Sequence, residues 1–142
     1  MPPRRLPKQL VVLFLLLAVI GFADSAYLTA EHVRGGIPPC SFTEGCGTVL
    51  TSAYAQIAGI PVAAMGLGYY ALLIVLMVAY LDIGKRALVH WAAWLTTVGL
   101  LASAYLVAVQ AFVLRAYCPY CLLSATTSTG LFIVGAVIMR RD

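Results

Sequence analysis

Charged side chains are scarce in this chain. Only 10% of its 142 residues are Asp, Glu, Lys or Arg, whereas 63% are apolar. A soluble domain of average composition carries about 25% charged and about 45–50% apolar residues. The mean hydropathy of +0.98 therefore excludes an ordinary soluble globular protein. The formal charge of +4 forms no basic stripe interleaved with aromatic side chains, which argues against a nucleic-acid-binding surface.

Internal repeats and low-complexity linkers are absent as well, so residues 1–142 are expected to form a single domain. Most of the chain consists of apolar runs, each near the ~20 residues that cross a bilayer. They predict an all-α integral membrane protein, a four-transmembrane-helix bundle in contact with lipid. A basic segment precedes the first run, as in a cleaved signal peptide, but the apolar character extends too far and favours a retained span. The expected spans are about 10–29, 62–81, 87–114 and 121–139.

The segment between the first two spans begins as a loop, because residues 32–47 are rich in Gly and Pro. Thr48–Ala58 then predicts a short amphipathic helix, too short to span, that lies flat as a horizontal cap in the first outer loop. Gly59 and Ile60 end it, and Pro61 suits the first position of the next helix.

Basic residues set the expected orientation. Placing the N-terminus in the cytoplasm puts seven Lys and Arg residues inside and two outside, and cytoplasmic loops carry the excess of positive charge. The sequence therefore predicts cytoplasmic N- and C-termini in a multi-pass protein of the cell (inner) membrane. The inside set is Arg4, Arg5, Lys8, Lys85, Arg86, Arg140 and Arg141, and the outside set is Arg34 and Arg115.

The four cysteines all fall on the outer side in this topology. Cys40 and Cys46 lie in the first loop, and Cys118 and Cys121 form a C-x-x-C motif at the start of the fourth span. With Pro119 in the first helical position, the helix dipole would favour a thiolate at Cys118. Cys121 lies one turn deeper on the same face. This arrangement suits electron transfer from a water-soluble donor to a lipid-soluble acceptor.

Two other interpretations of the cysteines stay open at this point. Two static disulfides would staple the outer loops of a non-enzymatic membrane scaffold. Four thiolates could also hold zinc, although the Cys40–Cys46 spacing is not usual for a zinc site and no metal is expected. A pair in a loop together with a pair at a helix tip is more typical of a redox relay than of staples.

Several short pieces together resemble the vitamin K epoxide reductase family, in its prokaryotic form. Residues 23–29 resemble the end of that family's first helix, and Cys40 and Cys46 resemble its loop pair. Ser52 stands at its Ser/Thr position. Further matches are Gly59, Ile60 and Pro61 with Gly66 and Tyr70 at the start of its second helix, and Cys118-Pro119-Tyr120-Cys121 as its active-site motif.

The resemblance implies a thiol:quinone oxidoreductase. A separate DsbA-like thioredoxin-fold protein would reduce the Cys40–Cys46 pair, since no fused thioredoxin domain is expected. Cys46 would exchange with Cys118, and Cys121 would act on a quinone of the ubiquinone, menaquinone or vitamin K type. The chain has no Asn, which the vertebrate enzymes place near the quinone, so plain quinone reduction is expected rather than epoxide reduction.

Other residues near the C-x-x-C are candidates for the quinone site. Ser52 would hold the quinone or the loop, and the aromatic residues Phe112, Tyr117 and Tyr120 would line a slot beside Cys121. Asp24 lies near the end of the first span, where ionisable residues are functional candidates. It would either relay protons or make a buried polar contact.

Overall fold

The computed structural model describes residues 7–34, 56–57, 60–115 and 119–141. Within these ranges four helices are long and apolar enough to cross a membrane, which confirms the predicted all-α membrane fold. Each predicted span lies inside one of them, apart from the last residues of the third span, which form a π-helix. The elements are α1 (Lys8–Val33), α3 (Val62–Ile83), α4 (Arg86–Ala108), η2 (Val109–Leu114, the π-helix) and α5 (Pro119–Arg141).

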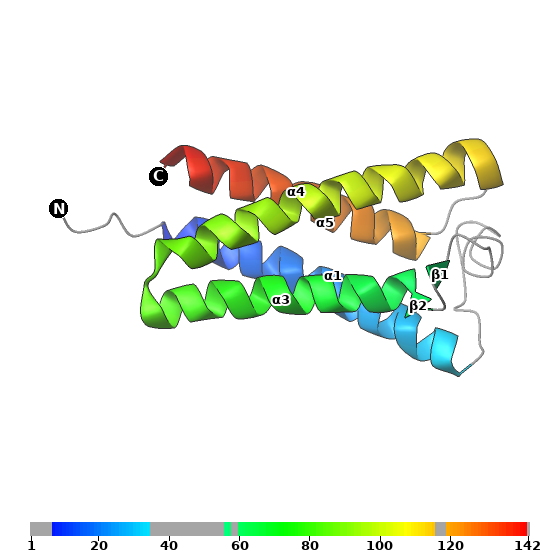
Figure 1. Ribbon diagram of the computed structural model, residues 1–142, viewed down its shortest axis with the longest axis horizontal. Helices are drawn as coiled ribbons and strands as arrows, with labels where there is room; N and C mark the ends of the chain where they lie inside the picture. The colour runs from blue at the N-terminus through cyan, green and yellow to red at the C-terminus, as the bar shows by residue number, and fades with distance from the viewer. Residues whose placement is uncertain (1–6, 35–55, 58–59, 116–118, 142) are drawn as a thin grey trace.

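The helices run side by side along the long axis of the molecule (Figure 1). The start of α1, the α3–α4 turn and the end of α5 lie at one end, and the start of α5 lies at the other. α1 packs against α3 and α5, and α4 packs against α3 and α5. Gly84 makes the tight α3–α4 turn with a φ of +80°, a conformation that costs glycine little.

The core is a column of apolar side chains along the bundle axis. Phe14, Leu73 and Leu131 come from three different helices and are almost fully buried. Large apolar side chains also cover the outside, among them Leu16, Val75 and Trp94. Such an apolar exterior would be unfavourable in water, and it suits the hydrocarbon core of a bilayer.

Small residues let the helices approach closely. A Cβ added to Gly21 of α1 would overlap the ring of Tyr70, and one added to Gly99 of α4 would overlap Tyr69. Small residues at helix contacts are typical of membrane bundles, because association there depends on close packing. The two adjacent tyrosine rings meet edge to face, 5.0 Å apart.

The predicted horizontal helix is not confirmed. Its residues 48–55 and 58 lie outside the described ranges, and the prediction is wrong at Gln56–Ile57, which form strand β1. β1 pairs antiparallel with β2 (Ile60–Pro61) in a two-stranded ladder. The physical reason is local: β-branched Ile57 and Ile60 favour extended backbone, and so does a position before proline. Pro61 consequently precedes α3, which begins at Val62.

The third span ends in a wider turn. Its last six residues form η2, and Arg115 closes it with a φ of 50° and a backbone N–H that donates to the Gln110 carbonyl. π-helical turns of this kind are rare and often mark functional sites. Val109 and Gln110 at the start of η2 are both buried.

Candidate active site

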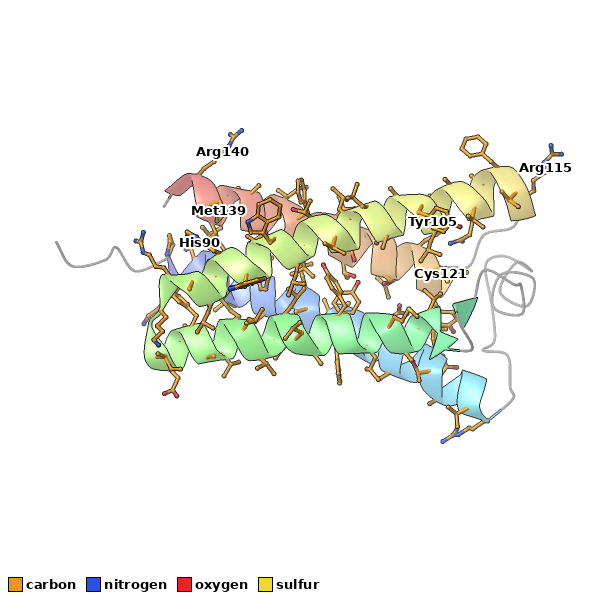
Figure 2. The ribbon with its side chains drawn as sticks, in the orientation of Figure 1. His90, Tyr105, Arg115, Cys121, Met139 and Arg140 are labelled. Carbon is orange, nitrogen blue, oxygen red and sulfur yellow. The ribbon has the colours of Figure 1, made fainter. Side chains whose placement is uncertain are left out.

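Cys121 lies in the first turn of α5, at the same end of the bundle as Arg115 (Figure 2). His90 and Arg140 lie at the opposite end. The Cys121 side chain is half-buried, so it reaches the edge of the bundle without being fully exposed. The helix begins at Pro119, as the C-x-x-C motif predicted.

Five other predicted site residues lie outside the described ranges. They are three cysteines of the predicted relay and two candidates for quinone binding: Cys40, Cys46, Cys118, Ser52 and Tyr117. The predicted order of electron transfer among the four cysteines therefore stays a prediction.

An aromatic pair lies at the start of α5, and one of its members precedes Cys121 in the chain. The rings of Tyr27 on α1 and Tyr120 on α5 are 5.5 Å apart and tilted by 44°. This distance is within the range of favourable aromatic contacts. The pair joins the end of α1 to the start of α5, next to Cys121. The sequence predicted Tyr120 as a site residue. It indicated Tyr27 only within residues 23–29, which resemble the end of the family's first helix, and predicted no role for it in the site.

Phe112 occupies a different environment from Tyr120. Its side chain is 80% exposed on η2, so it faces away from the buried helix contacts. Its predicted contact with quinone stays a prediction, and that contact would have to form on the lipid-facing side.

A cluster of hydroxyl groups is buried one to two turns below Cys121. The Tyr70 hydroxyl of α3 donates to the Ser124 carbonyl oxygen of α5 at 2.9 Å. It also lies 2.9 Å from the Ser124 and Thr127 hydroxyl oxygens and 3.0 Å from that of Ser128. We call Tyr70, Ser124, Thr127 and Ser128 the hydroxyl cluster. It binds α3 to the part of α5 that carries the cysteine.

Two polar residues of α1 are buried near the same end. Asp24 is 7% exposed and Ser25 is 3% exposed. The Ser25 hydroxyl packs against Gly66 of α3, where an added Cβ would be 3.0 Å from it. A buried carboxyl group inside a span is a functional candidate. The two expected roles of Asp24, a proton relay and a buried polar contact, both stay predictions.

The comparison with known families decides the assignment. The model of the vitamin K epoxide reductase family matches residues 12–136, from the first part of α1 to the last part of α5. The chain belongs to that family. It is therefore a multi-pass membrane protein of an oxidoreductase family known for quinone-related redox chemistry. This assignment favours the redox interpretation of the cysteines over a scaffold with static disulfides.

The match to the vitamin K epoxide reductase family spans every predicted site residue. Cys40, Cys46, Ser52, Cys118 and Cys121 all fall inside residues 12–136. In the part of the chain that the structure describes, no three His, Cys, Asp or Glu side chains lie close enough to hold a metal ion. Three of the four cysteines that a zinc site would need are outside that part.

Sequence reasoning missed the hydroxyl cluster of this family member. Ser124, Thr127 and Ser128 are spaced i, i+3 and i+4, so they share one face of α5. Polar residues on a single face of an apolar span are a usable signal, since they need partners inside the bundle. Their partner Tyr70 lies 54 to 58 residues earlier in the chain, and no local pattern indicates that contact.

Proposed function

We propose that the protein is a thiol:quinone oxidoreductase of the cell membrane. It oxidises a separate DsbA-like thioredoxin-fold protein on the outer face and reduces quinone to quinol, which supports disulfide-bond formation. The position of Cys121 carries this proposal: a half-buried sulfur in the first turn of α5, at one end of a membrane-length bundle. A sulfur at this depth is within reach of a lipid-soluble acceptor and of a second thiol at the surface.

Thiol–disulfide exchange accounts for the transfer of electrons along the chain. A thiolate of the partner attacks the Cys40–Cys46 disulfide, and the second partner thiol resolves the mixed disulfide. Cys46 then attacks Cys118 of the Cys118–Cys121 disulfide and releases Cys121 as a thiolate. Cys40 next attacks Cys46 of the mixed disulfide, which re-forms the Cys40–Cys46 disulfide and releases Cys118. The reduced pair gives up two electrons and two protons as its disulfide re-forms. A bound quinone supplies the acceptor for both.

The described side chains around Cys121 fit a flat aromatic ring with polar edges. The rings of Tyr27 and Tyr120 pack together at the same first turn of α5 that holds Cys121. The hydroxyl cluster lies one to two turns further along α5 and holds that helix against α3. In this proposal Ser52 and Tyr117 complete the site from the loops, and Phe112 lines the lipid-facing approach, where it is exposed.

The charge distribution supports an outer position for the cysteines. The end that carries Arg140 also has the α3–α4 turn with Lys85 and Arg86, whereas the Cys121 end has Arg115 (Figure 2). The positive-inside rule then places Arg140 in the cytoplasm and Cys121 on the outer face. Thiols there meet an environment that permits disulfides.

A turnover assay tests the proposal. Purified protein in detergent is mixed with a reduced DsbA-type partner and a soluble quinone analogue, and the quinone absorbance is followed. The wild-type protein is expected to consume quinone catalytically, and Cys118→Ala and Cys121→Ala each to lose at least about 100-fold in rate, as expected for loss of the redox dithiol.

Thr126→Val is the matched control for these variants. Thr126 lies on the same helix, but it is exposed and its hydroxyl donates to the Leu122 carbonyl oxygen of its own helix. This variant should retain the wild-type rate. Turnover that persists in Cys121→Ala would refute the mechanism. A wild-type protein without turnover, with cysteines unreactive to mild reductant, would establish the static scaffold instead.

A further inference from the structure

Tyr70 is the side chain that joins the middle of the bundle to the start of α5. It comes from the third turn of α3 and is 1% exposed. Its hydroxyl donates to the Ser124 main-chain carbonyl oxygen at 2.9 Å. A tyrosine hydroxyl has one proton to donate and accepts from its neighbours. The hydroxyls of Ser124 and Ser128, 2.9 and 3.0 Å away, are placed to donate back.

The Tyr70 ring is held as firmly as its hydroxyl. Gly21 of α1 packs so close that an added Cβ would overlap the ring. The ring of Tyr69 meets it edge to face on another side. The side chain is therefore fixed between α1 and α5, and its hydroxyl has little freedom to follow a movement of α5.

The bond to Ser124 acts on the turn that carries the cysteine. Ser124 follows Cys121 by three residues, so the two lie on the same face and about 4.5 Å apart along the helix axis. A rotation of α5 by one residue, about 100°, would break the bond and turn the sulfur away from its present direction. The bond from Tyr70 to Ser124 thus restrains the rotation of α5 about its axis and, with it, the direction of the Cys121 side chain.

We infer that Tyr70 is a positioning residue for Cys121: its hydroxyl bonds to α5 hold the reactive sulfur in its half-buried place. The predicted effect of Tyr70 on quinone reduction rests on the proposed function. The predicted effect of Tyr70 on the placement of the sulfur does not depend on it. Tyr70 touches no reacting atom in this role and acts through Ser124 and its neighbours.

Alkylation of Cys121 tests the placement without any quinone. The background is Cys40→Ala, Cys46→Ala and Cys118→Ala, so Cys121 is the one thiol, and the rate constant for a maleimide is measured at fixed pH. Tyr70→Phe should raise this rate constant about three- to tenfold, as expected when a helix–helix hydrogen bond in a membrane protein is lost and local opening increases. The matched control is Tyr80→Phe, another buried tyrosine of α3 but at the far end of the helix.

Ser128→Ala provides a second route to the same result. It removes a hydroxyl that faces Tyr70 and leaves the tyrosine in place. Its control is Thr129→Val, one residue on: Thr129 is exposed, and its hydroxyl donates to the Ala125 carbonyl oxygen of α5. Ser128→Ala should raise the rate constant in the same direction as Tyr70→Phe, while Tyr80→Phe and Thr129→Val stay within about twofold of the parent.

Turnover by the otherwise wild-type protein gives a second readout. Tyr70→Phe should lower kcat about three- to tenfold with KM for the quinone analogue nearly unchanged, because the sulfur rather than the binding site is displaced. Equal alkylation rates for Tyr70→Phe and Tyr80→Phe would overturn the inference. A faster alkylation of Cys121 in Tyr70→Phe, together with a wild-type protein that turns over no quinone, would support the positioning of Cys121 and refute the proposed function.

Discussion

At the scale of single residues, Gly21 and Tyr70 show how this bundle makes room for a buried tyrosine. The glycine is buried on α1, and a Cβ there would meet the Tyr70 ring, whereas a Cβ on Gly68 of α3 would have nothing within 4 Å. The two glycines are both in membrane-spanning helices, so they share intrinsic helix propensity. They differ in what surrounds them, which makes them a matched pair.

We expect Gly21→Ala to destabilise the protein by about 1–3 kcal/mol, because overpacking forces the tyrosine ring to move. Gly68→Ala should be neutral or stabilise by up to about 1 kcal/mol, since alanine favours helix more than glycine does. Unfolding of both variants in a mixed-detergent titration measures the difference. An equal effect of the two substitutions would contradict the close contact seen at Gly21.

Some residues of the site could be predicted from the sequence, and others could not. The C-x-x-C motif placed Cys121 correctly at the start of a helix, because proline and the end of an apolar run both mark that position. The packing of Tyr27 on Tyr120 and the burial of Tyr70 against α5 depend on how the helices rotate about their axes. Such rotations depend on side-chain packing between distant segments, and no local pattern encodes them.

At the scale of elements, the spans were predictable and the short irregular pieces were not. Long apolar runs identify membrane helices because every backbone group must be bonded inside the bilayer. The β1–β2 ladder has two residues on each side, which is too short for any periodic pattern, so Gln56–Ile57 read as the end of a helix. The switch to π-helix in η2 likewise follows no pattern of apolar residues.

The α3–α4 turn makes an element-scale prediction. Gly84 has a φ of +80°, where a side chain is strained, and nothing crowds it in space. Gly84→Ala should therefore destabilise the protein by about 1–2 kcal/mol through backbone strain alone. Lys85→Ala is the control, since Lys85 has an ordinary φ of −79°. Thermal unfolding of the two variants measures the difference: Gly84→Ala should unfold at a lower temperature than Lys85→Ala. Equal unfolding midpoints would argue against backbone strain at Gly84.

At the scale of the whole molecule, the two ends of the bundle differ in charge and in chemistry. The family match and the four membrane-length helices establish a multi-pass membrane protein. Which end faces the cytoplasm is a prediction from the positive-inside rule. A single surface position at each end is enough to test it, and Arg115 and Lys85 are both exposed.

We expect Arg115→Cys, in a background without other cysteines, to be labelled by a membrane-impermeant maleimide in intact bacterial cells or spheroplasts. Lys85→Cys should be labelled at least about tenfold more slowly until the membrane is permeabilised, because the bilayer separates the two ends. The reverse pattern would invert the orientation, and it would place the reactive cysteines in the reducing compartment, where the proposed reaction could not run.

The two-residue connection between α3 and α4 has a mechanical consequence. With only Gly84 and Lys85 between them, these helices form a hairpin whose halves cannot slide or tilt independently at that end. Any separation of α3 from α4 that admits a bulky lipid-soluble molecule is therefore hinged at the Gly84 end and is widest at the end of the bundle where Cys121 lies.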